Sequence, residues 1–336
     1  MNFITPFIAL SAVSIGTVVG QVPRQVIQTD DRATLQQVPL QGPELTAVQN
    51  VMTDFNRKVD VQLRKQPEYS RMTADLERLK TLKDPAQRRT AVARYQATYR
   101  PVLDKSLLAA KVSKAELKAQ LERTAPDQAF TFSSDYGLKA IARTTSKPQK
   151  LVKRQSTAAP GPTVQIIRLD DFTESHDKSG ALASSGDYDF SSTSVKSSSG
   201  AAIAGGCSVD ARLRKSYTVP ADVRKATLKL NCKLETDAYT VSVVGPSLAL
   251  AGSQFGVSTN QRNLNADSAY SSVLGVIGWV MFEESGEEID EEIDLPIGEK
   301  VDIYFSTYTT SMAGLSGYSD GHGRVKSIRV EIHLQR

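Results

Sequence analysis

Cysteine, histidine and tryptophan are scarce in this chain of 336 residues, which contains two, three and one of them. Two cysteines exclude a dense disulfide scaffold. The histidines stand far apart, at His176, His322 and His333, and with two cysteines they do not supply the usual ligands of a zinc site. Neither Gly-x-x-x-x-Gly-Lys nor His-Glu-x-x-His occurs, which excludes the signatures of P-loop nucleotide hydrolases and zinc proteases. These absences favour a binding protein over an enzyme.

Charge is divided unevenly along the chain. Residues 44–154 carry 23 Lys and Arg against 12 Asp and Glu, whereas residues 155–336 carry 16 against 23. The net charge of +4 is therefore the sum of a basic and an acidic half.

The N-terminal segment has the features of an export signal. Residues 1–20 contain no charge, and the apolar run from Phe7 to Val19 has the length of a signal-peptide core but not the about 20 residues of a membrane span. We expect a signal peptide over residues 1–20, a disordered segment over 21–43, and a secreted or extracytoplasmic protein with no integral membrane span.

Between residues 44 and 125, apolar residues recur every three or four positions, which predicts amphipathic helices. Asp84-Pro85 and Ser113 followed by Glu116 are helix start signals. We expect a helical domain of antiparallel hairpins or a bundle. Its basic residues alternate with acidic ones and no nucleic-acid-binding motif is present, so we expect a solvated surface, an anionic surface as partner, or contact with the acidic half, and no nucleic acid.

Residues 126–162 are rich in turn-forming and basic residues and show no sustained period, which is typical of a linker. The dibasic pair Lys153-Arg154 lies within this stretch. Cleavage after Arg154 would release the C-terminal half from a helical pro-region.

From residue 163 to 336 the apolar period becomes two, with Gly, Pro, Ser and Asn between the segments. The predicted strands are residues 164–169, 207–218, 226–234, 239–244, 273–282, 300–307 and 325–334. They predict an all-β sandwich domain, jelly-roll-like, in an α+β multidomain chain. Trp279 is expected in the core, and His322, between glycines, at an exposed turn.

Cys207 and Cys232 lie on the apolar faces of two predicted strands. In an oxidising compartment we expect them to form a disulfide. Closing this loop of about 25 residues would stabilise the fold by ~3 kcal/mol.

Eight acidic residues occur among residues 283–294. Within them Glu288-Ile-Asp-Glu-Glu292 resembles the Glu-Ile-Asp-x-Glu core of the laminarinase and lichenase glycosidases, which are also β-sandwiches. The resemblance implies Glu288 as nucleophile and Glu292 as acid/base, with Asp290 between them. A calcium site at Glu287, Asp290 and Asp294 is an alternative, because clustered carboxylates suit this ion; no other metal or cofactor is expected.

A tyrosine platform is the other candidate site. Alternation along residues 301–308 places Asp302, Tyr304 and Tyr308 on the outer face of a strand, and Tyr318 follows in the next loop. Such a face suits stacking against sugar rings, although tyrosines under another layer would show the same spacing.

The sequence thus favours an exported, non-enzymatic protein that binds a glycan, a cell surface or a protein partner through its β-sandwich. A secreted glycoside hydrolase using Glu288 and Glu292 is one alternative. A β-sandwich matured by cleavage after Arg154 is the other.

Overall fold

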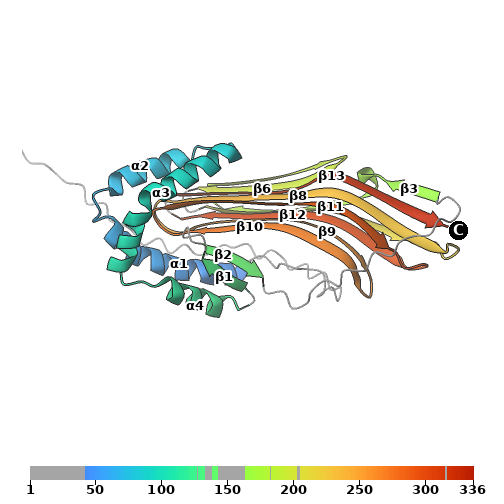
Figure 1. Ribbon diagram of the computed structural model, residues 1–336, viewed down its shortest axis with the longest axis horizontal. Helices are drawn as coiled ribbons and strands as arrows, with labels where there is room; N and C mark the ends of the chain where they lie inside the picture. Colours follow the sequence, from blue (N-terminus) through green and yellow to red (C-terminus); the bar gives the residue numbers. More distant parts are fainter. Residues whose placement is uncertain are drawn as a thin grey trace, which may run out of the picture.

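A computed structural model describes residues 42–126, 128–132, 138–142, 163–181, 183–202, 205–314 and 316–336. The expected signal peptide, residues 21–41 and the pair Lys153-Arg154 lie outside these ranges. Four helices gather at one end of the molecule's long axis, and a sandwich of two antiparallel sheets extends from them (Figure 1). The predictions of N-terminal helices and of a C-terminal β-sandwich are confirmed.

The helices are α1 (Gly42–Leu63), α2 (Tyr69–Leu79), α3 (Pro85–Ala109) and α4 (Lys114–Thr124). Two of the helices, α3 and α4, begin at the start signals found in the sequence. The Asp84 side chain accepts a hydrogen bond from the amide of Gln87 at the start of α3. The Ser113 hydroxyl accepts from two amides at the start of α4. These caps satisfy amides that have no partner within the helix.

The sandwich consists of a seven-stranded and a six-stranded sheet. The strand order is β1-β2-β10-β9-β12-β7-β4 in the first and β11-β8-β13-β6-β5 in the second, where β3 also pairs with β13. The strands are β1 (Gln128–Phe132), β2 (Leu138–Ala142), β3 (Thr163–Ile167), β4 (Thr173–Ala181), β5 (Ser184–Ser191), β6 (Ser194–Ala202), β7 (Gly206–Thr218), β8 (Lys225–Ser242), β9 (Ser247–Thr259), β10 (Asn263–Gly275), β11 (Trp279–Asp294), β12 (Lys300–Ala313) and β13 (Gly317–Gln335).

Several strands differ from those expected. The predicted strand 273–282 is a hairpin, because β10 ends at Gly275 and Gly278 turns the chain with a φ of +72°. This turn is apolar since the helices bury it, so it carries no polar turn signal. β8 joins two predicted strands into one, and β1 and β2 lie in the range assigned to a linker.

The helices and the sandwich share one hydrophobic core. Apolar residues of all four helices pack with the ends of β8, β9, β10 and β11. Trp279 is 0% exposed, as expected of a core residue, and its ring lies 6.0 Å from that of Tyr95 of α3. The Tyr95 hydroxyl donates to the carbonyl of Gly278, and the amide of Ile277 donates to Asn56 of α1. Burial of this kind makes the helices part of the sandwich rather than an appendage to it.

The two sheets approach closely where β13 crosses β9. A Cβ added to Gly321 or Gly323 would lie 2.9 or 2.6 Å from the backbone oxygen of Leu250 or Gly252. Only glycine fits such a contact. The side chains around it are correspondingly small hydroxyl groups, among them the buried Ser253 and Thr307.

The predicted disulfide between Cys207 and Cys232 is wrong, because both are free, buried thiols. Both strands do turn these residues inward. Cys207 on β7, however, lies against Gly186 on the edge strand β5, whereas Cys232 on β8 pairs with Ile289 on the opposite edge strand, β11. The sulfurs therefore face the interior at different positions across the width of the sandwich.

Candidate functional site

The outer face of the seven-stranded sheet carries the tyrosines of the predicted platform. We call the side chains of Tyr270, Tyr304, Tyr308, Gln254, Ser306 and Arg212 the tyrosine face. Strand β12 lies between β9 and β7, and alternation along it turns Tyr304 and Tyr308 away from the core residues Ile303 and Phe305. Both tyrosines are half-buried.

The two tyrosine rings lie flat across the neighbouring strand β9. In register, Tyr304 pairs with Gly256 and Tyr308 pairs with Gly252. A Cβ added to either glycine would come within 2.2 Å of the far end of the tyrosine ring. A Cβ stands close to the sheet, so each ring must lean over the glycine instead of standing upright.

Tyr270 of β10 extends this surface beyond β9, with its ring centroid 6.3 Å from that of Tyr308. The sequence did not identify Tyr270, because its strand was predicted only from residue 273 onward. The alternation of residues 266–272 was the signal that would have placed it.

Polar side chains lie between and beside the rings. Gln254 of β9 donates from Nε2 to the Ser306 hydroxyl at 2.7 Å, midway between the two tyrosines along β12. On β7, Arg212 donates from Nε and Nη2 to the two carboxylate oxygens of Asp210, at 2.8 and 2.5 Å. Ser306 is 4% exposed, so its hydroxyl mainly orients Gln254. The face therefore combines flat aromatic surface with the Gln254 amide and the exposed Arg212 guanidinium.

The predicted site residue Asp302 is on this face but is buried and paired. It accepts from Arg214 at 2.7 Å and from Ser216 at 2.5 Å. Burial opposes its ionisation, yet these hydrogen bonds outweigh burial and lower the pKa of Asp302. Its role is to hold Arg214, so it offers no free carboxylate to a ligand.

Burial raises the pKa of the Tyr308 phenol well above its ordinary value, and burial also raises that of Tyr270. Both phenols are neutral across the physiological pH range. With Arg212 and Arg214 each paired to a carboxylate, the face has little net charge.

Tyr318, the fourth predicted platform residue, does not belong to this face. It lies on β13 in the six-stranded sheet, where its hydroxyl donates to Asp320 at 3.1 Å. The prediction grouped Tyr318 with Tyr304 and Tyr308 because they are near in sequence, but β12 and β13 are in different sheets.

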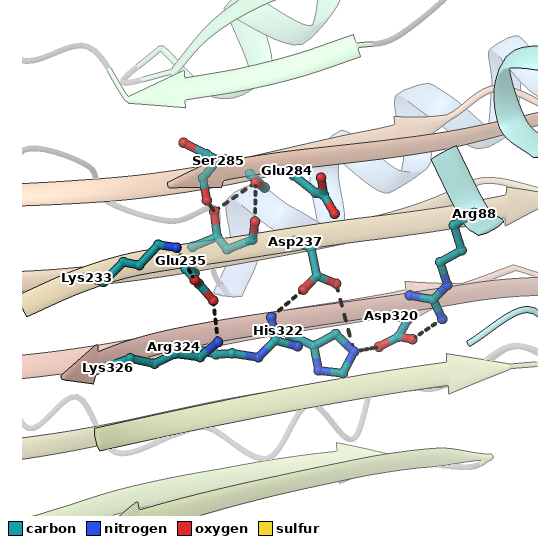
Figure 2. Close-up of polar contacts among 12 residues, drawn as sticks. Arg88, Lys233, Glu235, Asp237, Glu284, Ser285, Asp320, His322, Arg324 and Lys326 are labelled. Carbon is teal, nitrogen blue, oxygen red and sulfur yellow. Dashed lines mark hydrogen bonds and ion pairs between the residues drawn. The ribbon is translucent and has the colours of Figure 1, made fainter. Parts of the chain in front are cut away.

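Around Asp320, a chain of ion pairs connects the helices to the six-stranded sheet (Figure 2). Arg88 of α3 donates to Asp320 at 2.6 Å, and His322 lies 2.8 Å from the other oxygen of that carboxylate. Asp237 of β8 lies 4.0 Å from His322 and accepts from Arg324 at 2.8 Å. The expectation of an exposed turn at His322 is wrong, because β13 continues through its glycines to reach the helices.

The carboxylates of the glycosidase hypothesis lie on β11, an edge strand of the six-stranded sheet. Glu288, Asp290 and Glu292 are exposed on its outer face, opposite Lys233, Asn231 and Lys229 of β8. The pairing with β8 is regular throughout, so Glu288 and Glu292 lie about 13 Å apart. A retaining pair requires about 5.5 Å. These residues and the tyrosine face are on opposite faces of the sandwich, so the two predicted sites do not form one cleft.

The calcium alternative also fails on strand geometry. Along the regular strand β11, Glu287 faces the opposite side from Asp290 and Asp294. Across the described ranges, no three His, Cys, Asp or Glu side chains form a group that could hold a metal ion.

Residues 317–321 read Gly-Tyr-Ser-Asp-Gly and match the Gly-x-Ser-x-Gly pattern of hydrolase nucleophiles. Ser319, however, is 0% exposed near the start of β13 and faces the interior. The pattern requires a strained turn between a strand and a helix, which is not present at this point. We assign it no catalytic role.

The sequence matches no known family model and no curated protein. Several solved structures are weakly similar to this chain. A carbohydrate-binding module, TmCBM61 in complex with β-1,4-galactotriose, is 16% identical, with 46% of this chain and 86% of that chain covered and a TM-score of 0.17. A family 11 carbohydrate-binding module of Clostridium thermocellum is 11% identical, and the match covers 52% of this chain and 95% of that module, with a TM-score of 0.16. The enzymatically active domain of bacteriophage CBA120 tailspike protein 4 is 11% identical. The match covers 48% of this chain and 19% of that chain, with a TM-score of 0.16. Likenesses this weak assign no family.

No helix in the described part of the chain is long and apolar enough to cross a membrane.

Proposed function

We propose that the protein binds a glycan through the tyrosine face. The observation that carries the proposal is the pair of rings, Tyr304 and Tyr308, lying flat over Gly256 and Gly252 with Gln254 and Ser306 between them. A pyranose ring presents C–H groups on one face and hydroxyl groups around its rim. Flat aromatic rings pack against the former, and amide and hydroxyl groups bond the latter.

The spacing favours an oligosaccharide or polysaccharide over a single sugar. Tyr304 and Tyr308 are four residues apart on an extended strand, which separates them by about 13 Å. One sugar ring cannot stack on both. A chain of several sugars would contact the two tyrosines in turn, with Tyr270 beside the second.

The expected export of the protein fits this function, because polysaccharides are abundant outside the cytoplasm. A protein partner on the same face remains the competing hypothesis, since tyrosines are also enriched at protein interfaces.

The test is affinity electrophoresis of the full chain in gels that contain xylan, β-glucan, galactan or mannan. We expect at least one polysaccharide to retard the protein. The double variant Tyr304→Ala/Tyr308→Ala should weaken that binding at least ~10-fold, because it removes the stacking surface. The matched control Tyr304→Phe/Tyr308→Phe keeps both rings and should bind within about two-fold of the original chain.

The alanine variant also uncovers two glycines, so thermal unfolding of both variants must accompany the binding data. A folded alanine variant that binds as tightly as the original chain would contradict the proposal. Failure of the original chain to bind any of the polymers would contradict it as well.

A further inference from the structure

The two ends of the molecule carry opposite charge. Residues 42–126, which contain the four helices, have 17 Lys and Arg against 10 Asp and Glu. Residues 163–336, which form β3 to β13, have 16 against 23. Because the helices lie at one end of the long axis (Figure 1), the molecule has a positive end of net +7, and the strands β3 to β13 that extend from it carry a net charge of −7.

Within the helical end, half of the ten acidic side chains are used in local pairs. Five ion pairs join residues three or four positions apart: Asp54–Arg57, Asp60–Arg64, Asp75–Arg78, Glu77–Lys80 and Lys118–Glu122. Six exposed cations form no ion pair with any residue that the structure describes: Lys58, Arg71, Arg94, Lys105, Lys111 and Arg123. This end therefore keeps a net positive field.

Two large apolar side chains of the helices are exposed as well. Leu108, near the C-terminus of α3, is 81% exposed and stands between Lys105 and Lys111 in the sequence. Val61 of α1 is 53% exposed. Lysine and arginine together with a protruding leucine form the combination by which helices bind the surface of an anionic membrane.

We propose that the helical end docks on an anionic lipid surface, with Lys105 and Lys111 contacting the headgroups and Leu108 entering the interface. The same surface repels the acidic sandwich, so the long axis points away from the membrane. A soluble polyanion would also be attracted by the cations, but Leu108 would add nothing to its affinity. The contribution of Leu108 to binding therefore distinguishes a lipid surface from a soluble polyanion. This proposal does not depend on glycan binding at the tyrosine face.

Sedimentation of the full chain with vesicles tests it. Neutral phosphatidylcholine vesicles measure any binding through residues 1–20, which is common to all variants. Vesicles with about 30% phosphatidylglycerol should bind the protein more tightly, and 0.5 M salt should abolish the difference. A lysine near such a surface contributes about five-fold in affinity, so Lys105→Glu/Lys111→Glu should weaken binding at least ~25-fold.

Two further variants keep the proposal falsifiable. Arg224→Glu/Arg262→Glu changes the net charge equally at exposed positions of the sandwich and should bind almost as the original chain does. Leu108→Ser should weaken vesicle binding but leave retention on a heparin column unchanged. Equal losses in the two charge-reversal variants, unchanged vesicle binding by Leu108→Ser, or no preference for anionic vesicles would each overturn the proposal.

Discussion

The ion pair between Arg88 and Asp320 offers a quantitative test of how the helices are held on the sandwich. The Arg88 side chain is 1% exposed, donates to Asp320 and to the carbonyl of Leu82, and lies 4.4 Å from the ring centre of Tyr239. Asp320→Asn leaves this buried cation without its counterion. Breaking a buried pair in this way costs ~3–5 kcal/mol of the free energy of unfolding.

Removing the arginine instead of the carboxylate should lower the free energy of unfolding by less. After Arg88→Met, Asp320 still has His322 at 2.8 Å and Tyr318 at 3.1 Å. We expect a loss of ~1–3 kcal/mol, because a satisfied carboxylate remains. The double variant Arg88→Met/Asp320→Asn removes both charges, and its loss should be smaller than the sum of the single losses by ~2 kcal/mol.

Urea unfolding followed by the fluorescence of Trp279 measures these free energies of unfolding at the junction between the helices and the sandwich. Trp279 is the single tryptophan of the chain and lies in the core shared by the helices and strands. Additive single-variant losses, or a loss below about 1 kcal/mol for Asp320→Asn, would refute the view that this pair holds the junction.

Two further predictions concern pH and the cysteines. Burial opposes ionisation of Asp320, but the hydrogen bond and charge of His322 and the charge of Arg88 lower its pKa. Its ionised form therefore stabilises the fold above about pH 4, the pKa of an unfolded aspartate, and this contribution is lost as the pH falls below that value. Asp320→Asn should remove this acid-dependent part of the Trp279 unfolding curve; an unchanged pH profile would contradict the assignment. Burial raises the pKa of Cys207, and it raises that of Cys232 to about 12. Neither thiol should react with a disulfide reagent in the native protein. After denaturation without reductant, the reagent should detect two free thiols, and detecting no free thiol would indicate a disulfide between them.

Local signals in the sequence were enough to predict the helices and the type of the C-terminal domain. Asp84 and Ser113 cap helices because their side chains bond amides a few residues away, and such short-range chemistry is legible in one sequence. The alternation that turned Tyr304 and Tyr308 outward is equally local.

The failures share a different cause, which is the order of strands in the sheets. Tyr318 and Tyr308 are ten residues apart but lie in different sheets, and Cys207 and Cys232 face one interior from different positions across it. The acidic run looked like a site because its composition is unusual. Its regular pairing with the lysines of β8 shows instead how far apart along one strand the carboxylates stand.

The shared core has a consequence for how the chain folds. The apolar faces of α1 to α4 are complete only when the hairpin around Gly278 packs on them, about 150 residues or more after the last helix has been synthesised. Until then the helices can pack only on one another and on β1, and the remaining contacts, of long sequence separation, form slowly. Most of the chain must therefore leave the ribosome before this core is complete, and until then part of the apolar surface of the helices stays exposed to aggregation.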